Sequence, residues 1–176
     1  MTTAANTKFI QSAASFYSAA CPSCRDGGGG RAVEHRTILQ MLKPDRLERL
    51  ANLEFNFCQE RSCPVIYYST DGAVEFTADD LREKVGLKMQ GDPAARVCYC
   101  FGYTEGMIAD ELKATGQTTI PKKITQLTKT GMCACEVRNP AGVCRQQSGQ
   151  ASIRRVVGRN TANGYHSTRL PIALIL

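Results

Sequence analysis

The segment Glu54–Phe76, EFNFCQERSCPVIYYSTDGAVEF, carries the strongest strand signals of the chain. Two phenylalanines alternate with polar residues at its start, and Val65–Tyr68 is a β-branched and aromatic run. The following Asp71-Gly72 pair is typical of a hairpin turn. The segment therefore predicts a small β-rich unit that carries Cys58 and Cys63.

The residues around this unit predict short helices and a loop. Four consecutive glycines, Gly27–Gly30, indicate a flexible loop. His35–Leu42 predicts a short helix or an extended piece that stops before Pro44, and Asp45–Leu53 an amphipathic helix or turn. Thr77–Met89 predicts another short helix, with its first residue as N-cap and acidic residues in its first turn.

A second part follows a linker that we place near residues 90–96. Thr104 predicts the N-cap of a helix that runs to about Ala114, and a second helix is expected from Ile120 to Gly131. Cysteines stand on both sides of this helical hairpin.

Cysteine is the most unusual feature of the composition, with nine residues in a chain of 176. The N-terminus lacks the basic and apolar regions of a secretory signal, and no stretch reaches the roughly 18 apolar residues of a membrane span. We therefore expect a cytoplasmic protein without membrane association. In a reducing compartment, clustered cysteines are more typical of metal sites than of disulfides.

The first set of cysteines consists of two short pairs, Cys21-x₂-Cys24 and Cys58-x₄-Cys63. Two such pairs separated by tens of residues are typical of a closed, tetrahedral zinc site. The second pair is looser than the usual C-x₂-C spacing, and buried cysteines without a metal are the alternative. His35 is a candidate substitute ligand, although a lone histidine in a polar stretch is more typical of a solvated side chain.

The second set comprises Cys98, Cys100, Cys133, Cys135 and Cys144. A C-x-C pair directly before a helix N-terminus favours a negatively charged centre, because backbone N–H groups and the helix dipole point at it. Four soft thiolates suit a [2Fe–2S] cluster, and a second zinc ion is the competing interpretation. Five thiols are available, so one is surplus or structural.

Four stretches together resemble the N-terminal domain of the CopZ-type copper chaperones over about residues 18–150: CPSC, FCQERSCPVIYYS, VCYCFGYTEGMI and CACEVRNPAGVC. The second half is also similar to the helix–turn–helix [2Fe–2S] module of bacterioferritin-associated ferredoxin. The resemblance implies two metal centres. The implied zinc ligands are Cys21, Cys24, Cys58 and Cys63, and the implied cluster ligands are Cys98, Cys100, Cys135 and Cys144.

The sequence departs from this family in two places. Family members commonly carry two adjacent cysteines after the NPxG turn, whereas this chain has only Cys144. We prefer Cys144 as the fourth ligand, and Cys133 becomes the substitute if the cluster needs the second thiol of that pair. The family also carries a C-terminal copper-binding domain, and residues 145–176 contain no cysteine. We therefore do not expect copper handover by this chain alone.

The expected fold is α+β, a small zinc-bearing β-rich subdomain followed by a helix–turn–helix [2Fe–2S] module. We divide the chain into a flexible leader (1–20), the zinc-binding subdomain (21–90), the cluster-binding hairpin (97–150) and a mobile basic tail (151–176).

The resemblance implies a metallochaperone-type protein whose one-electron transfer supports reduction of Cu(II) to Cu(I) or copper delivery, with copper bound transiently. The expected partners are a copper-transporting ATPase, a copper-binding domain supplied by another protein, or an electron-donor reductase. The first alternative is a ferredoxin-like module that serves a reductase or an iron-storage partner.

The second alternative is a zinc-ribbon protein that binds nucleic acid through arginines. The net charge of +6 suggests it, but eight cysteines on one Zn²⁺ and one [2Fe–2S]²⁺ core would lower this to about +2. The chain also lacks an aromatic–basic stretch for base stacking. With only two histidines and no catalytic motif, we do not expect an enzyme. The candidate arginines are those at 138, 145, 154, 155, 159 and 169.

Overall fold

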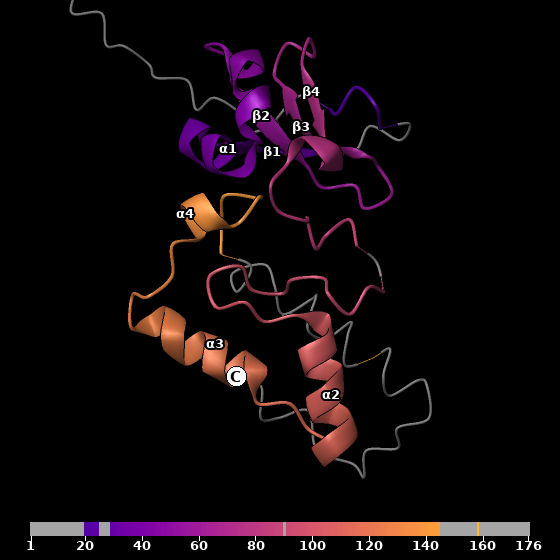
Figure 1. The fold of residues 1–176 in the computed structure, drawn as a ribbon, viewed down its shortest axis with the longest axis vertical. Helices are drawn as coiled ribbons and strands as arrows, with labels where there is room; N and C mark the ends of the chain where they lie inside the picture. Colours follow the sequence, from indigo (N-terminus) through magenta and orange to yellow (C-terminus); the bar gives the residue numbers. More distant parts are fainter. Residues whose placement is uncertain (1–19, 25–28, 90, 145–157, 159–176) are drawn as a thin grey trace, which may run out of the picture.

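The structure is a computed structural model that describes residues 20–24, 29–89, 91–144 and 158. A sheet with one short α-helix lies at one end of the molecule, and a helical hairpin follows it in sequence and lies at the other end (Figure 1). This arrangement is consistent with an α+β chain. The predicted leader (except Ala20) and basic tail (except Gly158) lie outside the described residues, and the boundary near residues 90–96 stays a prediction.

Four antiparallel strands form the sheet in sequence order. Gly30 lies opposite Cys58, and Phe55 opposite Ser69, so the second strand is paired on both sides. The turn at Gly72 confirms the predicted hairpin. The first strand was not predicted, because its first residue belongs to the four-glycine run. The strands are β1 (Gly30–Val33), β2 (Phe55–Cys58), β3 (Val65–Ser69) and β4 (Glu75–Thr77).

The two faces of the sheet bury different side chains. Helix α1 (His35–Met41) and the 3₁₀ helix η1 (Pro44–Leu50) contribute Ile38 and Leu50 to an apolar core that includes Phe55 and Tyr67. The other buried cluster consists of cysteines and sheet residues, namely Cys21, Cys58, Cys63, Val65 and Tyr68, with Cys24 packed against it. The sheet therefore separates the apolar core from the first set of thiols.

The helix predicted over Thr77–Met89 is much shorter in the structure. Only one 3₁₀ turn, η2 (Ala78–Asp80), forms, and Thr77 and Asp80 make a capping box at its start. The chain becomes extended at Leu81, which pairs with Leu42 and is buried. Tertiary burial of this leucine therefore overrides the local helical preference.

The helical hairpin agrees closely with the prediction. Helix α2 (Glu105–Thr115) begins after Thr104, whose hydroxyl oxygen accepts a hydrogen bond from the N–H of Met107, and it ends at Gly116 with φ +73°. Helix α3 (Ile120–Lys129) follows, with Pro121 in its first turn. A third, short helix, α4 (Cys135–Arg138), was not predicted because four residues carry no periodic signal. The hairpin core consists of Val97, Ile108, Ile120 and Ile124.

Candidate metal centres

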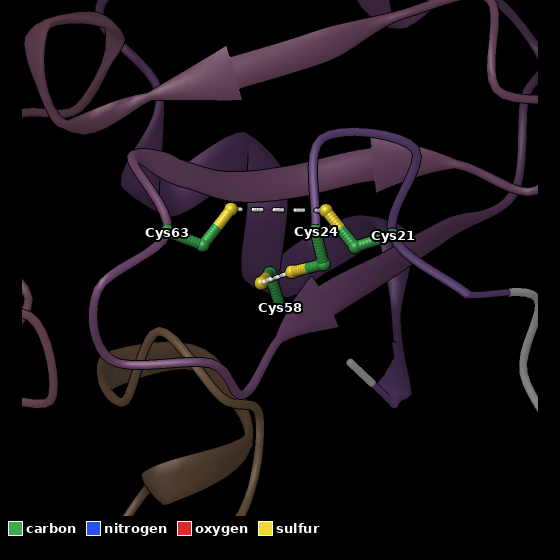
Figure 2. Close-up of side chains that lie close together, drawn as sticks. All are labelled: Cys21, Cys24, Cys58 and Cys63. Carbon is green, nitrogen blue, oxygen red and sulfur yellow. Dashed lines mark hydrogen bonds between the residues drawn. The ribbon is translucent and has the colours of Figure 1, made fainter. Parts of the chain in front are cut away.

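The four cysteines of the first set come from two loops that the sheet brings together (Figure 2). Cys21 and Cys24 flank a turn in which the N–H of Cys24 donates to the carbonyl of Cys21 at 3.0 Å. The Ser23 hydroxyl fastens this turn to Glu75 at the start of β4, with an O–O distance of 2.8 Å. The geometry of this turn fixes Cys21 and Cys24 relative to each other, and the sheet sets their distance from Cys58 and Cys63.

The second pair stands at the connection of two neighbouring strands. Cys58 is the last residue of β2, and Cys63 lies two residues before β3. Within the loop between them, the Glu60 carboxylate accepts hydrogen bonds from the N–H and the hydroxyl of Ser62. This short return fixes the separation of the two thiols.

The spacing of the sulfurs fits one tetrahedral ion. All four Sγ atoms lie within 4.8 Å of one another. The Sγ–Sγ distance is 3.6 Å for Cys24 and Cys58 and 4.0 Å for Cys21 and Cys63. Four thiolates at about 2.3 Å from a central Zn²⁺ stand about 3.8 Å apart. The donor set and its geometry therefore suit a structural zinc ion, as predicted, and His35 at the exposed start of α1 is not part of this group.

Burial and mutual contact govern the protonation of these thiols. Burial raises the pKa of Cys21 to about 11, against an opposing hydrogen bond from the N–H of Ser23. Burial also raises the pKa of Cys24, and its contact with Cys58 adds to this. For Cys63, burial acts upward, but hydrogen bonds from the N–H of Val65 and from the neighbouring thiols lower the pKa overall. Binding of a metal ion displaces the thiol protons, and the lowered pKa of Cys63 favours its thiolate form.

The second set of thiols gathers around the two ends of the helical hairpin. The Sγ atoms of Cys100 and Cys135 are 3.5 Å apart, across 35 residues of sequence. Burial raises the pKa of Cys135, and so do the hydrogen bond with Cys100 and the charges of Cys100 and Cys144. Burial raises the pKa of Cys98 as well, and the charges of Cys100 and Cys144 contribute. The four thiols that sequence reasoning preferred therefore influence one another.

Backbone N–H groups point at two of these sulfurs. The N–H of Ala134 donates to Sγ of Cys100 at 3.3 Å. Those of Phe101 and Cys100 donate to Cys98 and act to lower its pKa. Such donors stabilise the thiolate form that metal ions require. The half-buried fifth thiol, Cys133, makes no thiol–thiol hydrogen bond within the described residues.

The two sets of thiols differ in how compactly their sulfur atoms are grouped. Among the described residues, the first set is the only group of three or more candidate ligands whose donor atoms all lie within 4.8 Å. The thiols of the second set form no such group in the part of the chain that the structure describes.

A fold with a small antiparallel sheet and a compact Cys₄ group defines a zinc-binding domain. Residues 18–82 match the model of a protein family described as a zinc binding domain, zf_CopZ.

The chain is similar to the copper chaperone CopZ of Archaeoglobus fulgidus, with 33% identity over 125 residues. The match covers 70% of this chain and 56% of that relative, so the chain spans just over half of the relative's length. The X-ray structure of the N-terminal domain of Archaeoglobus fulgidus CopZ superposes with a TM-score of 0.60 at 28% identity, covering 76% of this chain and 96% of that domain. The chain is therefore homologous to that N-terminal domain.

The structure also bears on two other expectations from the sequence, which concern membrane association and nucleic-acid binding. No described helix has the length and apolar character needed to cross a membrane. Of the arginines considered for nucleic-acid binding, only Arg138 is described, and its guanidinium donates to the carbonyl of Cys100 at 3.5 Å; the others lie outside the described residues.

Proposed function

We propose that the chain binds one structural Zn²⁺ through the first set of thiols and one [2Fe–2S] cluster through Cys98, Cys100, Cys135 and Cys144. The observation that carries the proposal is the 3.5 Å contact between the sulfurs of Cys100 and Cys135, from the two ends of the helical hairpin, with Cys98 and Cys144 near enough to interact electrostatically with this pair. The zinc ligands are Cys21, Cys24, Cys58 and Cys63.

The zinc ion has a structural role in this proposal. All four coordination positions of a closed Cys₄ site are taken by the protein, so no position is open for a substrate. The site joins the turn at Cys21 to the ends of β2 and β3. A metal ion there stabilises a sheet of short strands that buries only a small core on its other face.

The second set forms no compact group of three or more candidate ligands among the described residues, which supports a cluster over a second zinc ion. A cluster with two irons needs two pairs of thiolates rather than one compact tetrahedron. Cys98 and Cys100 provide one pair and Cys135 and Cys144 the other, and the contact between Cys100 and Cys135 brings the two pairs together. The similarity to the module of bacterioferritin-associated ferredoxin belongs to this proposal as well.

Aromatic side chains next to Cys98 limit the access of water to this centre. Tyr99 is buried, and Phe101 and Tyr103 pack with Cys98 against the hairpin core. A [2Fe–2S] cluster, when bound, takes up and releases one electron at a time. An apolar surrounding on one side of the centre tunes its potential and slows its hydrolysis.

We infer that this electron serves copper handling. The similar protein of Archaeoglobus fulgidus is named a copper chaperone, and soft thiolate sites favour Cu(I) over Cu(II). Conversion of Cu(II) to Cu(I) takes one electron, which a reductase would supply through the second centre. Copper would then pass to a copper-binding domain or a copper-transporting ATPase. The proposed role is electron transfer and not enzymatic turnover of an organic substrate.

The first test is metal analysis and visible spectroscopy of protein purified without oxygen. We expect two irons, two sulfides and one zinc per chain, with charge-transfer bands. Cys144→Ser should lose the bands, whereas Cys133→Ser should keep them. A protein that binds only zinc, even after anaerobic reconstitution with iron and sulfide, would contradict the cluster.

The second test addresses copper. The reduced protein should convert Cu(II) to Cu(I), trapped by a Cu(I)-specific chelator, with one Cu(I) formed per cluster oxidised. Rapid reduction by a ferredoxin reductase without any reaction with Cu(II) would instead favour the general ferredoxin-like role.

A further inference from the structure

The turn that precedes Cys144 is buried against the zinc-bearing sheet. Asn139 is 4% exposed, and Pro140 is among the fully buried side chains. The hydroxyl of Tyr67, in the middle of β3, donates to the carbonyl oxygen of Pro140 at 2.7 Å. Tyr67 is itself 0% exposed, so this bond is shielded from water. The turn is therefore attached to the sheet by a polar contact inside the core.

Helix α4, which begins with Cys135, has a second attachment. Figure 1 shows α4 beside α1, and the two helices are in contact. The buried hydroxyl of Thr37, on α1, donates to the carbonyl oxygen of Glu136. Gly142 completes the fit: its φ is +67°, and a Cβ there would lie 3.1 Å from Cγ1 of Val33. A side chain at this position would push the turn away from the sheet.

The turn is also braced internally, so that its position determines the position of Cys144. The side-chain oxygen of Asn139 accepts from the N–H of Ala141 at 3.0 Å, and its amide group donates to the carbonyl of Val143 at 2.5 Å. Val143 directly precedes Cys144. The attachments at Tyr67 and Thr37 thus bear on both cysteines of the segment 135–144.

The opposite pair of thiols is attached to the same unit. Tyr99 stands between Cys98 and Cys100, and its hydroxyl oxygen accepts from the N–H of Gly86 at 2.7 Å. Burial raises the pKa of Tyr67, and the charge of Tyr99 adds to this. Both halves of the second thiol set are therefore fixed to residues of the zinc-bearing part.

We propose that Tyr67 and Thr37 are positioning residues for the second metal centre: they hold Cys135 and Cys144 against the zinc-bearing sheet, so that the sheet sets the separation of the two thiol pairs. Only the statement that these thiols hold a metal centre rests on the proposed function. The positioning of the two thiols is a property of the chain itself and is measurable without iron.

The test compares zinc-loaded, iron-free full-length protein by hydrogen exchange of the backbone amides of residues 136–144. Thr37→Val keeps the shape of the side chain but removes the donor, and Thr37→Ser keeps the donor. We expect about tenfold faster exchange in Thr37→Val and in Tyr67→Phe, because each leaves a carbonyl of the segment without its hydrogen-bond donor, in Tyr67→Phe a buried one. Thr37→Ser should exchange within about twofold of the unaltered protein.

Phe76→Leu is the matched control, because it perturbs the same core without touching the turn. It should lower the melting temperature but leave the relative exchange of residues 136–144 unchanged. Equal exchange in all variants, or equal acceleration in Phe76→Leu and Thr37→Val, would overturn the positioning role.

Iron-loaded samples give the second readout. Thr37→Val and Tyr67→Phe should shift the visible circular dichroism bands and the EPR g-values of the reduced protein. Both should also shorten the lifetime of the cluster in the presence of a chelator. Thr37→Ser, which keeps the hydroxyl donor, should match the unaltered protein in all three measurements. If the unaltered protein takes up no iron, the proposed function fails, while the exchange experiment still decides whether Tyr67 and Thr37 position the thiols. Unchanged spectra in all variants would contradict the inference.

Discussion

Replacement of Cys58 by serine gives the sharpest test of the first metal centre. Cys58 is 0% exposed at the end of β2, and its Sγ lies 3.6 Å from that of Cys24. Apparent zinc-binding free energies of structural sites are about 10–16 kcal/mol for four ligands, so one thiolate contributes about 3 kcal/mol. We therefore expect Cys58→Ser to raise the Kd for zinc by roughly 100- to 1,000-fold.

The same change should appear in thermal stability. With zinc in excess, binding stabilises the folded state by mass action, so a loss of about 3 kcal/mol carries over to unfolding. For a chain of 176 residues, this corresponds to a fall in Tm of roughly 6–12 °C. Circular dichroism melts with and without zinc measure it, and competition with a chromogenic chelator measures the Kd.

Two controls separate ligation from burial. A serine hydroxyl in a site without solvent also destabilises the fold, and the difference between Cys58→Ser and the unaltered protein without zinc measures that effect. Cys133→Ser, at a half-buried thiol outside the first set, should bind zinc normally. An unchanged Kd in Cys58→Ser, or an equal loss in Cys133→Ser, would refute the assignment of the site.

Two further predictions concern the hairpin and its junction with the sheet. Hydrogen bonds, first of all from the hydroxyl of Thr118, hold the pKa of Glu111 at about 2, below its ordinary 4.5, so the stabilisation is present above about pH 4.5 and is lost as pH falls toward 2. Glu111→Gln should remove about 1 kcal/mol of stability at pH 6 and much less at pH 3, measured by urea unfolding; an equal loss at both pH values would contradict this. A Cβ at Gly86 would lie 2.4 Å from the carbonyl oxygen of Arg96, so Gly86→Ala should destabilise the protein by about 2 kcal/mol or more, whereas Gly29→Ala, with nothing within 4 Å, should change it by less than about 0.5 kcal/mol. Equal melting temperatures for the two alanine variants would argue against the close approach at residue 86.

Most of the hairpin and three of the four strands were readable from the sequence. Alternation in β2, the turn at Asp71-Gly72, and the cap at Thr104 are local signals that depend only on neighbouring residues. The misjudged helix after Thr77 shows where local signals fail. Its capping box forms, but the burial of Leu81 against the sheet draws the chain out of the helix after one turn.

Which cysteines belong to a thiol set likewise depends partly on local sequence and partly on the tertiary structure. Each short pair is visible as a spacing in the sequence, because two cysteines within a few residues can turn toward one point. The joining of Cys24 to Cys58, across 34 residues, and of Cys100 to Cys135, across 35, depends on which segments the fold brings together.

Neither the extent of the second set nor its attachment to the sheet has a local signature. The hydrogen bond from Tyr67 to Pro140 joins residues 73 positions apart, and that from Thr37 to Glu136 joins residues 99 positions apart. Residue types and spacings thus identify the ligands and the helices, because these depend on short-range chemistry. The distance between two thiol pairs, and the buried contacts that hold them there, arise only when the chain folds, because they depend on which distant residues it buries together.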